Sequence, residues 1–127
     1  MTFDKFVEKF KKDIDYSYTG MILFHNGVVR GSSRSGGKVT KIKVKKDDEK
    51  IKQILEEVKK NKGISKVDIY VFEGEFSIGD DLMFAGVAGD IRDNVFPALE
   101  LLINRVKKEA LVKEEFFVKW FILINSK

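Results

Sequence analysis

Basic residues at the ends of predicted helices and strands are the residues of this chain whose types and spacing suggest chemistry. A segment near the C-terminus carries Lys107 and Lys113, and a Gly-Val-Val-Arg motif ends far upstream at Arg30. The surrounding sequence predicts that Lys107 ends an amphipathic helix, that Lys113 follows in a short loop, and that Arg30 ends a strand. Lysine offers a point charge and arginine a planar, two-pronged donor, and both suit phosphate or carboxylate groups. The sequence therefore predicts an anion-binding site.

Composition limits the chemistry that such a site could use. The 127 residues include no cysteine and a single histidine, His25, which excludes disulfides, thiolate catalysis and a multi-histidine metal centre. We expect no metal site and no cofactor. The net charge of +4, from 24 basic and 20 acidic residues, is too small to indicate nucleic-acid binding by itself. A lysine-rich chain also fits a thermophilic source or an A/T-rich genome, so composition is an alternative explanation for each lysine.

Length and hydrophobicity favour one folded domain that spans residues 1–127. The chain is 43% hydrophobic and 12% aromatic, more than a disordered chain would carry. No apolar run of about 18 residues is present to cross a membrane. The N-terminus lacks the apolar segment and small-residue cleavage site of a secretory signal. We therefore expect a cytoplasmic protein that does not associate with membranes.

Hydrophobic periodicity predicts the elements that must position these basic residues. Apolar residues three and four positions apart predict three helices, the first a short one within residues 1–15. The second has its apolar face over 51–58, with Asp47 or Asp48 as its cap. The third has its core face over 95–106, with Asp90, Asp93 or Asn94 as its cap. Alternating or continuously apolar runs predict strands over 18–29, 39–44, 67–71, 82–88 and 116–124, the first with a bulge or kink near its end.

The remaining segments are interpreted as connections. Gly31–Gly37 reads as a flexible loop, and residues 74–81 as a turn-rich connection between two strands. Pro97 is expected in the first turn of its helix, because proline lacks the amide donor that an interior position requires. His25, alone in its strand, is interpreted as a partly buried polar residue rather than as a catalyst.

The order of these elements indicates an α+β fold. A short N-terminal helix precedes a core over residues 18–124, in which two long helices pack against a mixed or antiparallel sheet. No repeat, linker or low-complexity tract divides the chain.

Several short motifs, taken in order, resemble the catalytic large subunit of molybdopterin synthase, the MoaE family. In that family a strand ends in Gly-x-Val-Arg, a turn reads Gly-x-Leu-x-x-Gly-Asp, a helix opens with His-Arg-x-x-x-Phe, and lysines follow near its far end. The matching residues, spread over about residues 19–115, are Phe24-x-x-Gly27-x-Val29-Arg30, Val67-x-Ile69, Gly74-x-Phe76-x-x-Gly79-Asp80, Arg92-x-x-x-Phe96, Lys107 and Lys113.

The resemblance implies a two-layer, hammerhead-like domain and a role in molybdenum cofactor biosynthesis. The implied reaction moves sulfur from the thiocarboxylated Gly-Gly tail of a ubiquitin-like small subunit to cyclic pyranopterin monophosphate, which gives molybdopterin. A homodimer that binds two small subunits as a heterotetramer is implied as well. Lys107 and Lys113 are then the catalytic candidates, and Arg30, Arg92 and Lys108 the substrate-binding candidates. Lys113 matches its family position only if one residue is deleted.

Departures from the family pattern keep a second interpretation open. Val71-Phe72 stands where the family has His-Arg, and Ile91 where it has the histidine before Arg92. Leu111-Val112 replaces its Pro-x-Trp. A non-catalytic member of the family, which binds only a protein partner or an anionic ligand, would also fit. A small RNA-binding domain fits less well, because its sheet aromatics should alternate with basic residues and those of this chain do not.

Overall fold

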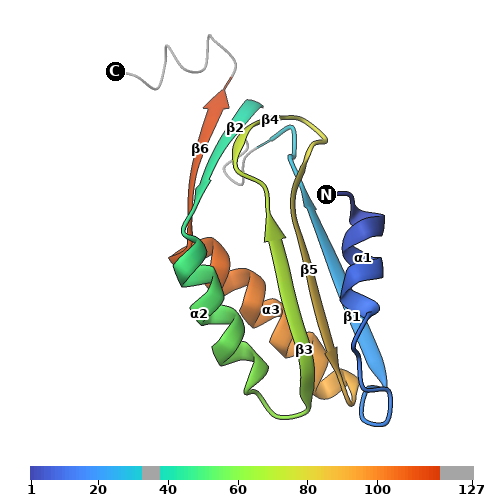
Figure 1. Ribbon diagram of the computed structural model, residues 1–127. Helices are drawn as coiled ribbons and strands as arrows, with labels where there is room; N and C mark the ends of the chain where they lie inside the picture. Colours follow the sequence, from blue (N-terminus) through green and yellow to red (C-terminus); the bar gives the residue numbers. More distant parts are fainter. Residues whose placement is uncertain (33–37, 118–127) are drawn as a thin grey trace.

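The computed structural model describes residues 1–32 and 38–117, which form three helices and six strands (Figure 1). In chain order these elements are α1 (Phe3–Lys11), β1 (Met21–Val28), β2 (Val39–Lys46), α2 (Asp48–Lys59), β3 (Ile64–Val71), β4 (Gly74–Ser77), β5 (Asp81–Gly89), α3 (Arg92–Glu109) and β6 (Leu111–Phe117). The predicted α+β fold class is confirmed.

The strands form two sheets, not the single sheet that the sequence predicts. One sheet has the order β1-β5-β3 and the other β4-β2-β6, and every pairing between these strands is antiparallel. Figure 1 shows the first sheet as the long body of the molecule and the second sheet beyond the ends of α2 and α3. The separation arises because β2 pairs with β4 and β6, which leaves β1 and β3 as the neighbours of β5.

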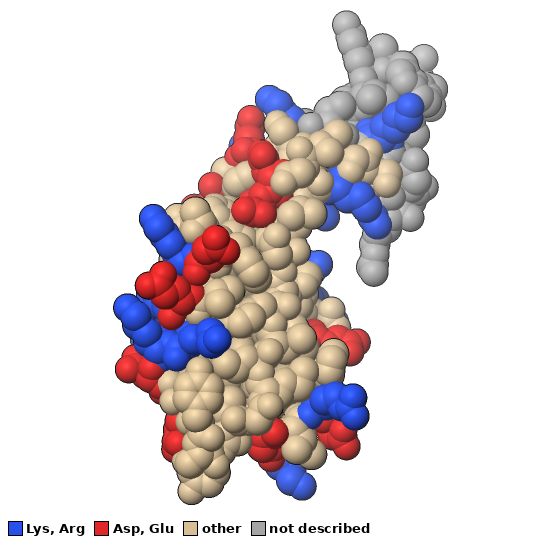
Figure 2. Space-filling model, turned by 90° about the vertical axis from the view of Figure 1, so that its right-hand side faces the viewer, with Lys and Arg blue, Asp and Glu red and all other residues tan. Residues whose placement is uncertain are grey.

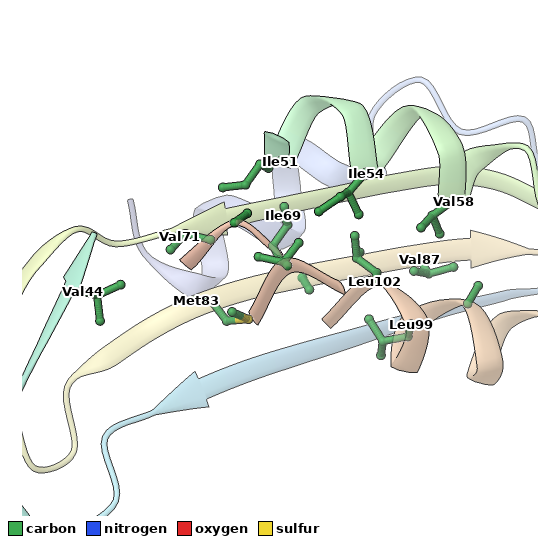
Figure 3. Packing of buried hydrophobic residues seen from close by; sticks show 14 of the residues in the cluster. Val44, Ile51, Ile54, Val58, Ile69, Val71, Met83, Val87, Leu99 and Leu102 are labelled. Carbon is green, nitrogen blue, oxygen red and sulfur yellow. The ribbon is translucent and has the colours of Figure 1, made fainter. Parts of the chain in front are cut away.

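Helices α2 and α3 cover one face of the first sheet with aliphatic side chains. Figure 3 shows Ile54 of α2 and Leu102 of α3 converging with Val87 of β5, and all three are fully buried. Each such side chain contributes about 1.5–3 kcal/mol relative to an exposed position. The predicted cap of α2 is confirmed as Asp47, whose carboxylate accepts a hydrogen bond of 3.1 Å from the Lys50 amide.

Helix α1 covers the opposite face of the same sheet with aromatic side chains. Phe6 and Phe10 are buried against Phe24 of β1, with edge-on ring contacts. The ammonium group of Lys66 on β3 donates hydrogen bonds to the carbonyls of Phe10 and Lys12, at 2.7 and 2.9 Å. These bonds satisfy carbonyls that the end of α1 leaves without helical partners. The first sheet therefore has one aliphatic and one aromatic face.

Two predicted connections differ from the observed structure. Residues 74–77, predicted as part of a turn, form β4, in which Phe76 is half-buried between exposed Glu75 and Ser77. The last strand begins at Leu111, not at residue 116, because β6 pairs with β2 from there onward. Residues 118–124 of the predicted strand and 33–37 of the predicted loop lie outside the described residues.

The start of α3 also differs from its prediction. The cap position is Ile91, and none of the three predicted polar residues occupies it. Asp90 instead accepts hydrogen bonds from the Asn94 side chain, at 2.8 Å, and from the Ile91 amide, at 2.7 Å, and these bonds lower the pKa of its carboxyl group. Pro97 lies inside the helix and not in its first turn. The prediction for the N-terminal helix is confirmed, since α1 falls within the predicted residues 1–15.

The aromatic face gives a test of this packing. A Cβ atom added at Gly86 of β5 would lie 2.9 Å from the Phe10 ring and 3.1 Å from the Phe24 ring. We expect Gly86→Ala to lower the free energy of unfolding by about 1–3 kcal/mol, because both rings must shift. Urea denaturation measures this loss. Gly31→Ala is the control, since among the described residues its Cβ would meet only Ile78, at 3.5 Å. Equal unfolding free energies for the two variants would contradict the packing.

Candidate functional site

Lys107 and Lys108 lie in the last turn of α3, as the sequence predicts for Lys107. Positive charge is favourable there, because the carbonyl end of a helix carries partial negative charge. Both side chains are exposed, whereas the neighbouring Val106 is fully buried. The backbone of this turn is therefore anchored in the core while its lysines reach the surface.

Lys113 lies on β6, opposite Val44 of β2, and not in the predicted loop. Directly opposite residues of paired strands point to the same face, so Lys113 shares a face of the second sheet with Val44, which is buried. Ala110 joins α3 to β6, and its carbonyl accepts a hydrogen bond of 2.9 Å from the amide of Asp47. Lys107 and Lys113 therefore lie on either side of a junction that a hydrogen bond fixes.

Arg30 directly follows the end of β1, as predicted. The preceding residue, Val29, is buried and exchanges two backbone hydrogen bonds of 2.9 Å, with Asp80 and Gly79. The guanidinium Nε of exposed Arg30 donates a hydrogen bond of 2.8 Å to the carbonyl of Ser32. The strand end is thus held against the β4–β5 turn, and the hydrogen bond to Ser32 uses one of the five N–H donors of Arg30.

His25 occupies β1 on the side that faces α3. It pairs with Ala85 of β5, which belongs to the aliphatic core that α2 and α3 cover. Its Nε2 atom is buried and has no hydrogen-bond partner among residues 1–32 and 38–117. Burial, and then the positive charge of Lys107, lower the pKa of His25 below its ordinary value. The structure therefore brings His25 into the electrostatic reach of Lys107.

Arg92 lies at the opposite end of α3 from Lys107. The two residues are fifteen positions apart in one continuous helix, which corresponds to about 22 Å along its axis. Arg92 lines a shallow hollow together with Gly20, Asp90 and Phe96. Within one chain, Arg92 therefore does not share a site with Lys107, and its substrate-binding role stays a prediction.

The neighbouring Arg105 is engaged in ion pairs on the outer side of α3. Its guanidinium Nε donates to Glu109 at 2.8 Å and its terminal nitrogen lies 3.3 Å from Glu57 of α2. Lys50 also lies 3.5 Å from Glu109. The hydrogen bond from Arg105 lowers the pKa of the Glu109 carboxyl group. These cations join α2 to α3, so the basic residues of this region have at least two separate roles.

The described part of the chain gives two further negative observations. No three or more histidine, aspartate or glutamate residues within it lie close enough to hold a metal ion. None of the helices in residues 1–32 and 38–117 is long and apolar enough to span a membrane. The expectation that the protein uses neither metal nor cofactor stays a prediction.

Sequence reasoning placed Lys107 and Arg30 at the ends of their elements, but it missed the relation between His25 and Lys107. The two residues lie far apart in the sequence, and no local pattern connects them. One signal was available. His25 is polar, although it lies on the same face of β1 as Leu23, which packs against the aliphatic core.

The relation between His25 and Lys107 is testable because His25 is the only histidine. We expect its proton NMR signals to titrate below pH 6.5, and Lys107→Ala to raise this pKa by removing a nearby positive charge. Since the unfolded chain then binds the proton more readily, the free energy of unfolding should fall as the pH drops below about 6.5. Lys108→Ala is the matched control, and an equal rise in both variants would contradict the arrangement.

Known proteins match this chain over most of its length. The family model described as MoaE protein matches residues 2–109. An uncharacterized protein from Methanocaldococcus jannaschii is 33% identical over 109 residues, which cover 83% of this chain and 87% of that protein.

Solved structures with a similar fold are molybdopterin synthase subunits. Molybdopterin synthase from Staphylococcus aureus superimposes with a TM-score of 0.76 at 22% identity, covering 94% of this chain and 87% of that one. A protein–protein complex of subunits 1 and 2 of molybdopterin-converting factor from Helicobacter pylori contains a chain with a TM-score of 0.69 at 15% identity, covering 94% and 85%. The TM-scores establish a shared fold, and the family match extends over most of the chain. The chain therefore belongs to the MoaE family.

Proposed function

We propose that this chain is the catalytic large subunit of a molybdopterin synthase, a cytoplasmic sulfurtransferase of molybdenum cofactor biosynthesis in which residues 1–127 act as one domain. Its substrate would be cyclic pyranopterin monophosphate, and its sulfur donor the thiocarboxylated Gly-Gly tail of a ubiquitin-like small subunit. Membership of the MoaE family supports this role. The solved complex of the two Helicobacter pylori subunits supports a small-subunit partner. Within the structure, the observation that carries the proposal is the position of Lys107 at the anchored end of α3.

The chemistry of the two ligands explains why the site needs several cations. The pterin brings a phosphate group and the carrier tail brings a thiocarboxylate, so negative charge must be held at two places. Lys107 and Lys113 flank one junction and are suited to the thiocarboxylate and to proton transfer during sulfur release. Arg30, with its planar donor group, is suited to the phosphate. Each transferred sulfur leaves a carboxylate on the carrier, and water supplies the oxygen.

The position of Arg92 bears on the proposed homodimer. Since Arg92 lies about 22 Å from Lys107 along α3, it can serve that site only if a second copy of the chain supplies it. Exposed apolar side chains give such a copy a surface to bury, among them Val28 on β1 and Ile91 and Phe96 at the start of α3. Figure 2 shows that the middle of the face on the β1 side has few charged residues.

A non-catalytic member of the family is the alternative function. It is favoured by one observation, the loss of imidazole groups at Val71 and Ile91, where the family pattern has histidine. Such a protein would keep the anion site and bind the carrier or the pterin without moving sulfur. The retained Arg30 and Lys107 agree with both functions.

A single-turnover reaction tests the proposed function. Purified protein, cyclic pyranopterin monophosphate and a thiocarboxylated small subunit should give molybdopterin, which is measured by fluorescence after oxidation. We expect Lys107→Ala to lower the rate by about 100-fold or more, because the charge it supplies acts in the transition state. The matched control is Lys59→Ala, an exposed lysine in the last turn of α2. Binding of both ligands without any product would favour the non-catalytic alternative.

Mixing two inactive variants tests whether Arg92 and Lys107 act across a dimer. If each site combines Lys107 of one chain with Arg92 of the other, a mixed dimer of Arg92→Ala and Lys107→Ala chains contains one intact site. After the subunits exchange, we expect about a quarter of the wild-type activity to return. Each variant alone, carried through the same exchange, is the control. No recovery, with mixed dimers verified by mass spectrometry, would remove Arg92 from the site of the partner chain.

A further inference from the structure

We propose that His25 is an additional residue of this site, and that its Nε2–H group donates a hydrogen bond to the carrier-tail carboxylate or thiocarboxylate that Lys107 neutralises. This inference rests on the proposed function. The inference goes beyond the proposed function because the family motifs quoted above assign no role to the position of His25.

The unsatisfied nitrogen of His25 is the first observation behind this inference. Buried polar atoms in proteins nearly always have hydrogen-bond partners, and a buried atom without one lowers the stability of the folded state. The Nε2 atom of His25 is such an atom among the residues that the structure describes. A carbon side chain at this position would avoid the loss, as Leu23 does two residues earlier on the same face. Exceptions of this kind concentrate at functional sites.

The surroundings of the imidazole ring indicate which chemical group it would meet. Lys107 places a positive charge within electrostatic reach of the ring, so an anion is the favoured ligand in this region. A carboxylate or thiocarboxylate only accepts hydrogen bonds, and the nitrogen that contacts it must therefore carry the proton. A neutral imidazole with the proton on Nε2 meets this requirement without adding a second cation beside Lys107.

Gly27 provides room for the ring on the same face of β1. A Cβ atom added there would lie 3.2 Å from Nε2 of His25 and 3.1 Å from the side chain of Met83. Any larger residue would press on the imidazole from the side of the strand end that carries Arg30. The absence of a side chain at Gly27 therefore leaves space for the imidazole ring, in addition to the place of Gly27 in the Gly-x-Val-Arg motif.

His25 does not occupy the place of either missing family histidine. Val71, at the first of these positions, is buried in the aliphatic cluster on the same face of the first sheet as His25, but it lies on β3. Ile91 precedes α3, at the end of the helix that lies farthest from Lys107. The imidazole that this chain offers beside Lys107 therefore comes from a third position, on β1.

The unique histidine makes the contact directly observable. The probe is the small subunit encoded in the same genome, ending in Gly-Gly as a carboxylate, added to the whole protein. We expect the His25 proton signals to shift on addition of this carrier and to stay unchanged with a carrier that lacks the two glycines. Full-length carrier that binds without moving the His25 signals would overturn the inference. This measurement does not require turnover, so it remains decisive if wild-type protein forms no product.

Substitutions then separate a ligand contact from a purely structural role. We expect His25→Leu to slow single-turnover sulfur transfer by about 10- to 100-fold, the loss of one hydrogen bond to a charged group, while His25→Gln, whose amide donates a hydrogen bond, recovers most of the rate. Asn26→Ser is the control, since Asn26 is exposed on the other face of β1 and bonds to Asp81 at 3.2 Å. Equal rates for His25→Leu and wild type would refute the contact and leave the proposed function intact. No activity in wild type would count against the proposed function instead.

Discussion

The hydrogen bond from the Asp47 amide to the Ala110 carbonyl is the contact on which the arrangement of the site depends. Asp47 ends the connection from β2 and caps α2 with its carboxylate, so one residue fixes the start of that helix and the end of α3. The adjacent pairing of Lys46 with Leu111 begins the second sheet at the same point. Both sheets and both long helices therefore meet where Lys107 and Lys113 project, and the spacing of these lysines follows from backbone contacts.

The two faces of the first sheet explain why the site lies on one of them. The α1 side is closed by interlocking phenylalanine rings, which leave no room even for a methyl group at Gly86. The α2 and α3 side is aliphatic and fully covered along most of its length. Toward the end of β1 this cover changes, because His25 and Gly27 take the inward positions that Met21 and Leu23 hold earlier in the strand. A polar ligand can therefore contact this face of the sheet only where the run of apolar side chains ends.

Local pattern was enough to predict most helices and strands, and long-range pairing accounts for the rest. The apolar spacing of α2 and the capping chemistry of Asp47 are properties of neighbouring residues, which the sequence displays directly. The bulge near the end of β1 was likewise signalled by its own residues and is observed between Gly27 and Val28. The division into two sheets and the early start of β6 depend on which strand each segment meets, and strand propensity carries little of that information. The same limit explains why Lys107 was found from its own helix while its electrostatic effect on His25 was not predicted.

The helix dipole alone does not account for the environment of Lys107. Lys59 ends α2 with the same favourable position relative to its helix, about 0.3–1 kcal/mol at an exposed end, so stabilising a helix requires no special neighbour. What distinguishes Lys107 is an imidazole within its electrostatic field, whose protonation that charge opposes. A histidine held neutral beside a lysine presents one hydrogen-bond donor and one cation to the same ligand, a combination that matches a carboxylate or thiocarboxylate better than it matches water. The physical chemistry of this pair therefore favours an anion-binding role for the end of α3 over a purely structural one.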